Sequence, residues 1–92
     1  METVLSEKVI VGNAMGLHAR PAAQLVHIAG KFKAALTVRK SGAPAADCRS
    51  VLALLMLAAS KDTELEITAS GSDAREALDA VVAYFGKNFD EQ

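Results

Sequence analysis

A histidine, an arginine and a proline stand close together in the segment Gly16–Pro21, which reads Gly-Leu-His-Ala-Arg-Pro. Proline is tolerated in the first turn of a helix but breaks a helix further in, so Pro21 places a helix start close to His18. The apolar residues that follow recur at the spacing of one helical face, and Gly30 ends this pattern. We therefore expect an amphipathic helix from about His18 to Ala29.

The start of this helix could carry phosphoryl chemistry. Free backbone amides and the positive end of the helix dipole form an anion site beside His18. Neutral imidazole is a nucleophile whose bond to phosphorus is labile, so it can accept and release a phosphoryl group. The helix end and Arg20 favour the neutral ring and would stabilise the transferred group. Taken alone, His-x-Arg-Pro is also consistent with an ordinary helix start, in which His18 is the N-cap residue and Arg20 a solvated charge.

The composition predicts one small domain spanning residues 1–92. The chain has 92 residues, of which 51% are hydrophobic, and a formal net charge of −1. This length leaves no room for a classical cofactor-binding fold, and the charge gives no indication of a nucleic-acid or membrane partner. The lone Cys48 excludes an internal disulfide, and the longest apolar run, Val51–Ala59, is far below a membrane span of ~20 residues. We expect a cytoplasmic protein that binds other proteins and needs no cofactor.

The hydrophobic patterns along the chain predict the element order βαββαβα. Asp73 and Glu76 have the spacing of a capping box before the last helix. Most strands have one apolar and one polar face, which predicts an α+β fold with an antiparallel sheet covered by helices on one side only. Besides the helix at His18, the expected elements are a strand at Val9–Val11, a hairpin of Ala34–Arg39 with Ala45–Cys48, a helix at Arg49–Ala59, a strand at Leu65–Ala69 and a helix at Ala74–Gly86.

The middle helix has more apolar residues than one buried stripe needs. Ser50 stands at its N-cap position, where the hydroxyl can bond a free amide. One interpretation of the excess is a partner-docking surface, and the other is a helix buried more fully, for instance under Phe89. The sector facing the sheet is expected to hold Leu54, Leu57 and Ala58, and the neighbouring sector Val51, Leu52 and Leu55.

Two other kinds of site are disfavoured. A metal site could be built from His18, His27 and Cys48, but nine residues along a helix place the two histidines about 180° apart. We expect no metal, with His27 at the surface or its boundary and Cys48 in the core or at an edge. A self-contained hydrolase is also disfavoured, because the sequence places no carboxylate to orient His18 and no second nucleophile beside it. The chain is therefore expected not to be an enzyme.

Three segments together resemble the HPr family, the histidine phosphocarriers of the phosphoenolpyruvate-dependent phosphotransferase system. They are Gly-Leu-His-Ala-Arg-Pro-Ala at 16–22, Arg49-Ser50 before the second apolar helix, and Ala69-Ser70-Gly71 before the last helix. The resemblance extends from about Val9 to Phe89. It implies an open-faced sandwich in which a four-stranded antiparallel sheet, ordered 1-4-2-3, is covered by three helices.

The resemblance also assigns roles and partners. It implies that His18 is phosphorylated on Nδ1 by phospho-enzyme I, that Arg20 pairs with the phosphoryl group, and that an enzyme IIA type protein is the acceptor. Ser50 matches the serine that a dedicated kinase/phosphorylase modifies in some bacteria. The carrier is expected to be a monomer, and its docking patch for these partners matches Val51, Leu52 and Leu55.

Some segments depart from the sugar-type carriers. After Ser50 the chain reads Val-Leu-Ala-Leu-Leu-Met-Leu, unlike the Ile-Met-Gly-Val-Met typical of carriers under serine-kinase control. Together with Ser50–Leu57, two further segments look like the nitrogen-related branch: Asn13–Gly16, and Ala80–Phe85 leading to Phe89-Asp90-Glu91. Both sugar uptake and nitrogen or carbon regulation are therefore possible outputs. The alternative function is a binding module of the same fold that docks onto regulators without transferring phosphate. The presence of both His18 and Arg20 favours the carrier.

Overall fold

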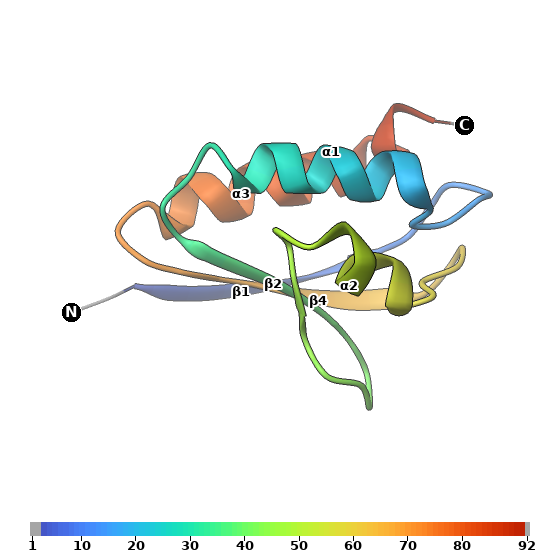
Figure 1. Cartoon of the computed structure of the whole chain (residues 1–92), viewed down its shortest axis with the longest axis horizontal. Coiled ribbons are helices and arrows are strands. Elements are labelled where there is room, and N and C mark those ends of the chain that lie inside the picture. The colour runs from blue at the N-terminus through green and yellow to red at the C-terminus, as the bar shows by residue number, and fades with distance from the viewer. Residues whose placement is uncertain (1–2, 92) are drawn as a thin grey trace.

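The chain folds into an antiparallel sheet with helices packed on one of its faces (Figure 1). The computed structural model describes residues 3–91. The sheet has four strands in the order β1-β4-β2-β3, which confirms the α+β class and the strand order implied by the resemblance. The elements are β1 (Val4–Ile10), α1 (Ala19–Ala29), β2 (Ala35–Lys40), β3 (Ala46–Asp47), α2 (Val51–Met56), β4 (Glu64–Ser70), α3 (Ala74–Gly86) and a final 3-10 turn, η1 (Asn88–Asp90).

Strand β4 shows how the two faces of the sheet differ. Leu65, Ile67 and Ala69 are fully buried beneath the helices. Burial of a large aliphatic side chain contributes roughly 1.5–3 kcal/mol, so this alternation fixes the register of the central strand. The alternate residues lie on the open face, where Glu66 accepts a hydrogen bond from Arg39 at 2.9 Å. The sheet is therefore one layer of a two-layer domain, as the alternation predicts.

Strand β1 is longer than the sequence predicted and ends one residue earlier. It begins at Val4 rather than Val9, and Val11 follows the strand as a fully buried residue. Most of β1 is exposed at the sheet edge, so its side chains show no apolar alternation. Its position comes from backbone pairing with β4 along the whole strand, from Val4 opposite Ser70 to Ile10 opposite Glu64. Pairing of this kind leaves little trace in the sequence of one strand.

Helix α2 is shorter than predicted, and one expected core residue lies outside. Ser50 caps the helix, because its Oγ accepts a hydrogen bond from the Ala53 amide at 3.1 Å. Leu54 and Leu57 are buried as expected. Ala58 is instead exposed, because it follows the helix with a φ of 51° and has left the helical face.

The capping box predicted at Asp73 does not form. Asp73 is the N-cap residue of α3, but its side chain makes no cap hydrogen bond. Its carboxylate accepts hydrogen bonds from the amides of Lys33 at 2.9 Å and Ala34 at 2.8 Å. The bond from the Lys33 amide is the main cause that lowers the pKa of Asp73. The carboxylate thus ties the connection between α1 and β2 to the start of α3.

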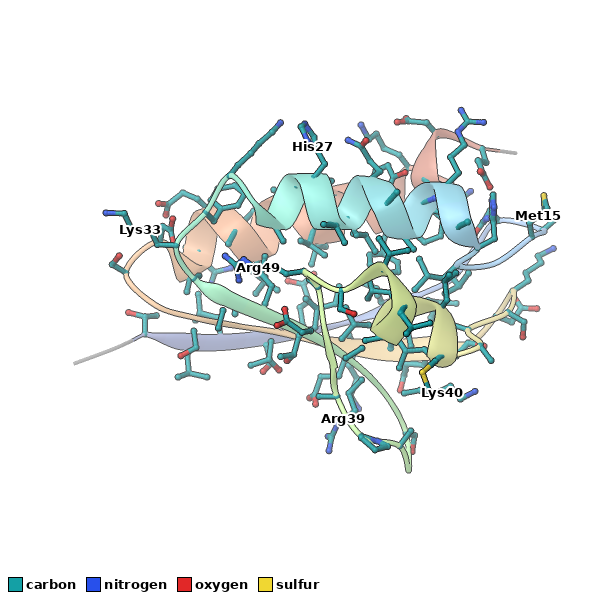
Figure 2. All side chains as sticks on the ribbon, in the orientation of Figure 1. Met15, His27, Lys33, Arg39, Lys40 and Arg49 are labelled. Carbon is teal, nitrogen blue, oxygen red and sulfur yellow. The ribbon has the colours of Figure 1, made fainter. Side chains whose placement is uncertain are left out.

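Arg49 binds backbone carbonyl groups at and after the C-terminal end of α1. Its side chain reaches toward this end of the helix (Figure 2), and Nη2 donates to the carbonyl oxygens of Ala29 at 3.3 Å, Phe32 at 2.8 Å and Ala34 at 3.3 Å. These bonds join the end of α1 to the first residues before β2. Within residues 3–91 no helix is both long and apolar enough to cross a bilayer.

We expect Arg49→Ala to lower the free energy of unfolding by about 1.5–3 kcal/mol, the range for hydrogen bonds to a charged group. Urea denaturation measures this change. Arg75→Ala is the control, because among residues 3–91 Arg75 makes only an exposed pair with Asp79 at 3.4 Å, and such pairs contribute about 0.3–0.5 kcal/mol. Equal destabilisation by the two variants would show that the contacts of Arg49 with the carbonyl groups contribute nothing.

Candidate functional site

The loop between β1 and α1 is held against the connection that follows α2. Gly16 has a φ of 69°, and a Cβ there would lie 2.5 Å from the carbonyl oxygen of Ala59. The next residue, Leu17, is buried and donates its amide to the same oxygen at 2.9 Å. Only glycine combines this conformation with this close approach. The loop therefore delivers His18 to the start of α1 in a fixed position.

His18 is the N-cap residue of α1, but its ring does not cap the helix. Its backbone is extended, with φ −90° and ψ −170°, and the side chain makes no cap hydrogen bond. The first amides of a helix have no partner within the helix, so the N–H groups of Ala19 and Arg20 are available to an anion. His18 is thus the N-cap residue of an ordinary helix start, and the same helix start offers an anion site. The His18 ring binds neither group and has another partner.

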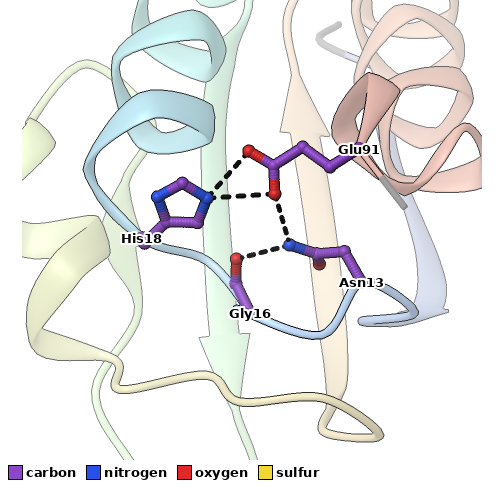
Figure 3. A network of polar contacts seen from close by, with 4 residues as sticks. All are labelled: Asn13, Gly16, His18 and Glu91. Atoms are coloured by element: carbon purple, nitrogen blue, oxygen red, sulfur yellow. Dashed lines mark hydrogen bonds and ion pairs between the residues drawn. The ribbon is translucent and has the colours of Figure 1, made fainter.

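That partner is Glu91, near the C-terminus (Figure 3). The Nε2 atom of His18 lies 2.8 Å from Oε2 and 3.0 Å from Oε1 of Glu91. A carboxylate can only accept, so Nε2 carries a proton and the neutral ring has its lone pair on Nδ1. Among the described residues, no hydrogen bond engages Nδ1. No carboxylate near His18 could be identified from the sequence, and the structure supplies one from a position 73 residues away.

Asn13 joins this carboxylate to the loop before α1. Its side chain is fully buried, and Nδ2 donates to Oε1 of Glu91 at 2.9 Å and to the carbonyl oxygen of Gly16 at 2.9 Å. Figure 3 shows the four residues as one chain of contacts. Asn13 therefore links the position of Glu91 to the loop that positions His18.

The final turn of the chain presents Glu91. Asn88, Phe89 and Asp90 all have positive φ, at 53°, 58° and 58°, a conformation that costs roughly 1–2 kcal/mol for each such residue. Phe89 offsets this cost, because it is only 3% exposed and packs against the rings of Tyr84 and Phe85 at centroid distances of 5.2 and 4.9 Å. Phe89 thus packs on α3, and Leu52 and Met56 on the outer face of α2 stay exposed, so the interpretation in which Phe89 covers α2 is wrong.

The charges around the site favour an ionised Glu91. The hydrogen bond from His18 is the largest cause that lowers the pKa of Glu91, and Asn13 and the charge of Arg20 act in the same direction. The ionised contact therefore contributes stability at neutral pH that is lost only as the pH falls through this lowered pKa. Arg20 is exposed and makes no hydrogen bond or ion pair with any described residue. Its guanidinium is free to meet an incoming anion.

Helix α2 exposes an apolar patch, defined here as Leu52, Leu55 and Met56. These side chains are 69%, 37% and 76% exposed. Two of the three residues proposed for docking, Leu52 and Leu55, belong to it, whereas Val51 is half-buried. Met56, 76% exposed, is a member of this outer face that the sequence did not indicate, because it stands within a continuous apolar run.

His27 and Cys48 do not join the site. His27 points from α1 away from the sheet (Figure 2) and is exposed. Cys48 is fully buried, and this burial raises the pKa of its thiol to about 12. The exposed position of His27 and the buried position of Cys48 agree with the surface and core placements expected for them.

Comparisons with known proteins agree on one family. The profile of a family described as "PTS HPr component phosphorylation site" matches residues 5–87. The phosphocarrier protein NPr of Proteus mirabilis is 39% identical over 84 residues, which cover 91% of this chain and 93% of that protein. The phosphocarrier protein HPr of Pseudomonas aeruginosa is 37% identical over 84 residues, with 91% and 93% covered. The crystal structure of an HPr from Thermoanaerobacter tengcongensis superposes with a TM-score of 0.89 at 31% identity, covering 96% of this chain and 98% of that one.

Proposed function

Since this chain belongs to the HPr family of phosphocarriers of the phosphotransferase system, we propose that it carries the phosphoryl group on Nδ1 of His18. Membership of this family implies interaction with enzyme I and with enzyme IIA type proteins. One observation supports His18 above all: Glu91 binds Nε2 at 2.8 Å, which leaves the Nδ1 lone pair at the start of α1. We propose phospho-enzyme I as the donor and an enzyme IIA type protein as the acceptor, in the cytoplasm where phosphoenolpyruvate is formed.

The groups around Nδ1 suit a reversible transfer. The lone pair of Nδ1 attacks phosphorus while the bond from phosphorus to the donor breaks, and the donor keeps that electron pair. Amides of Ala19 and Arg20 and the guanidinium of Arg20 can then donate to the phosphoryl oxygens. Because these donors are fixed before the reaction, they stabilise the charge of the phosphoryl group without reorganisation. Onward transfer reverses these steps with a different partner, so the chain is a carrier and not a catalyst acting alone.

The proposal is tested by incubating the protein with phosphoenolpyruvate and enzyme I from a relative. We expect one acid-labile phosphoryl group, which 15N–31P nuclear magnetic resonance correlation should locate on Nδ1 of His18. A relative's own carrier, labelled in the same mixture, is the positive control. Docking of enzyme I without labelling would favour the alternative, a binding module that does not transfer.

We propose a regulatory output in the nitrogen-related branch. The segments Asn13–Gly16 and Ala80–Phe85 support this branch, as does similarity to proteins named NPr. A protein named HPr is nearly as similar, at 37% identity against 39%, so overall identity does not separate the branches. The two branches can be distinguished by measuring the rate of phosphoryl transfer from this protein to a nitrogen-type enzyme IIA and, separately, to a sugar-type enzyme IIA.

The apolar patch on α2 is the proposed docking surface for these partners. Leu52 is 69% exposed within this patch, so we expect Leu52→Glu to weaken binding of enzyme I about tenfold, as for a side chain that contributes strongly to an interface. Its thermal unfolding should stay unchanged. Isothermal titration calorimetry with enzyme I measures the affinity of each protein for that partner.

Val4→Glu is the matched control for this variant. Val4 is 63% exposed at the free edge of the sheet, on β1, and receives the same change from apolar to acidic. We expect its affinity for enzyme I to stay at the unmodified level. Equal affinities of the two variants would show that the patch is not the docking surface.

Ser50 lies at the start of this surface, and we propose it as the regulatory position of a monomeric carrier. A phosphate there would place two negative charges beside Leu52 and so weaken docking. Its nearby positive partner would be the free amides of α2, because the Arg49 guanidinium is engaged with three carbonyl groups. Phosphorylation of Ser50 would therefore block the patch without a new ion pair to Arg49.

A further inference from the structure

We propose that Glu91 is a positioning residue for phosphoryl transfer, which keeps the proton of His18 on Nε2 and offsets the positive charge that the ring gains with the phosphoryl group. This inference deepens the proposed function and rests on His18 as the phosphoryl acceptor. It concerns a residue in the last turn of the chain, far in sequence from the His-x-Arg-Pro segment.

Glu91 selects the tautomer of His18. A neutral imidazole has one ring nitrogen with a proton and one with a lone pair, and its hydrogen-bond partner selects between them. Both oxygens of Glu91 lie within 3.0 Å of Nε2, and neither can donate while the group is ionised. The contact therefore selects the tautomer in which Nδ1 is the nucleophile.

Phosphoryl transfer changes the charge of the His18 ring. When Nδ1 forms its bond to phosphorus, the donor's bond to phosphorus breaks and the donor takes that electron pair. No proton leaves Nε2, so the His18 ring changes from neutral to a cation. In the onward step the ring recovers the electron pair and departs as neutral imidazole, with the same proton still on Nε2. A carboxylate 2.8 Å from Nε2 stabilises the cation, and partial burial limits screening by water, because the side chains of His18 and Glu91 are 28% and 16% exposed.

Glu91 is held in place by several contacts. Asn13 is fully buried, and its Nδ2 donates to the oxygen Oε1 of Glu91. Phe89 fixes the turn two residues before Glu91 by packing on α3. The Asn88 side chain fills the space where a Cβ at Gly12 would lie, so the same turn packs on the loop before α1. Three separate contacts thus maintain a turn with three positive φ angles, and the result is a carboxylate aimed at one ring nitrogen.

The experiment compares Glu91→Ala, Glu91→Gln and the control Asp90→Asn. Glutamine keeps a carbonyl oxygen that can accept from Nε2 but loses the charge. Asp90 is an adjacent carboxylate that pairs with Lys87 at 3.7 Å, so its loss changes the net charge equally without touching His18. Two quantities are measured: the 15N shifts of the two ring nitrogens at a pH where the ring is neutral, and the rate of phosphoryl transfer from phospho-enzyme I.

We expect the unmodified protein and Glu91→Gln to show the Nε2–H tautomer alone, and Glu91→Ala to show a mixture of tautomers. At saturating phospho-enzyme I, the transfer rate should fall about tenfold in both Glu91 variants, with KM unchanged. The rate of Asp90→Asn should stay within about twofold of the unmodified protein. Circular dichroism checks that α3 and the sheet are retained.

Normal rates in both Glu91 variants would overturn the proposal and leave His18 as the acceptor, because these variants would still be labelled. A rise in KM without a fall in rate would also overturn it, since Glu91 would then serve docking. If even the unmodified protein takes no label while the control carrier does, the proposed function fails instead. The ring shifts are measured without phosphate, so they still decide whether Glu91 sets the tautomer.

Discussion

His18→Ala is expected to abolish phosphorylation by enzyme I and phosphoenolpyruvate, because no other described side chain places an uncommitted nucleophile at the start of α1. The fold should remain, with a change in the free energy of unfolding within about 1 kcal/mol. The ring is only partly buried and makes no cap bond, and its removal leaves Glu91 in contact with Asn13. Acid-labile phosphoryl content and urea denaturation measure the two effects.

His27→Ala is the matched control, since His27 is the other histidine of the chain and lies exposed on the same helix. It should be labelled at the unmodified rate. Retention of label in His18→Ala, or its loss in His27→Ala, would place the phosphoryl group elsewhere and end the assignment of His18.

The start of α1 and the central strand β4 were predictable because each depends on local rules. Pro21 restricts where a helix can begin, and the alternation of Leu65, Ile67 and Ala69 identifies a strand with one buried face. The edge strand β1 follows a different rule, since its backbone pairs with β4 while its side chains remain largely exposed. A strand placed by its neighbour carries little pattern of its own, which is why only its last two residues, Val9 and Ile10, were predicted.

The site divides in the same way. His18 and Arg20 stand in one short segment, and the helix rules that position them act over a few residues. Glu91 depends on the left-handed turn at Asn88–Asp90 and on the packing of Phe89 against α3. Asparagine and aspartate are enriched at positive φ, but phenylalanine is not, so the sequence does not indicate three successive residues of this kind. The carboxylate partner of His18 could therefore be found only from the folded chain.

The same turn also removes one of the two interpretations of α2, the one in which Phe89 covers the helix. Sequence alone allowed the extra leucines either to be covered by the C-terminal residues or to face a partner. Phe89 packs on Tyr84 and Phe85, so it is unavailable to α2, and Leu52 remains 69% exposed. The packing of Phe89 thus helps to position the turn that carries Glu91 and also leaves the proposed docking patch exposed.

Arg20→Ala is expected to slow phosphoryl transfer about 10- to 100-fold, which corresponds to the roughly 1.5–3 kcal/mol of a hydrogen bond between charged groups. Its effect on stability should be within about 0.5 kcal/mol, because the side chain is exposed and makes no bond with a described residue. Single-turnover transfer from phospho-enzyme I and urea denaturation test the two statements separately.

Arg20→Lys separates charge from geometry in this prediction. Lysine keeps the positive charge but lacks the planar fork that binds two phosphoryl oxygens, so its rate should lie between those of the unmodified protein and Arg20→Ala. If Arg20→Lys transfers at the same rate as Arg20→Ala, the planar guanidinium accounts for the whole contribution of Arg20 to the transfer rate, and its charge alone contributes nothing. Loss of stability in Arg20→Ala comparable to that expected for Arg49→Ala would instead make Arg20 a structural residue. Its proposed role would then be wrong, and the helix amides and Glu91 would be left as the groups that stabilise the transfer.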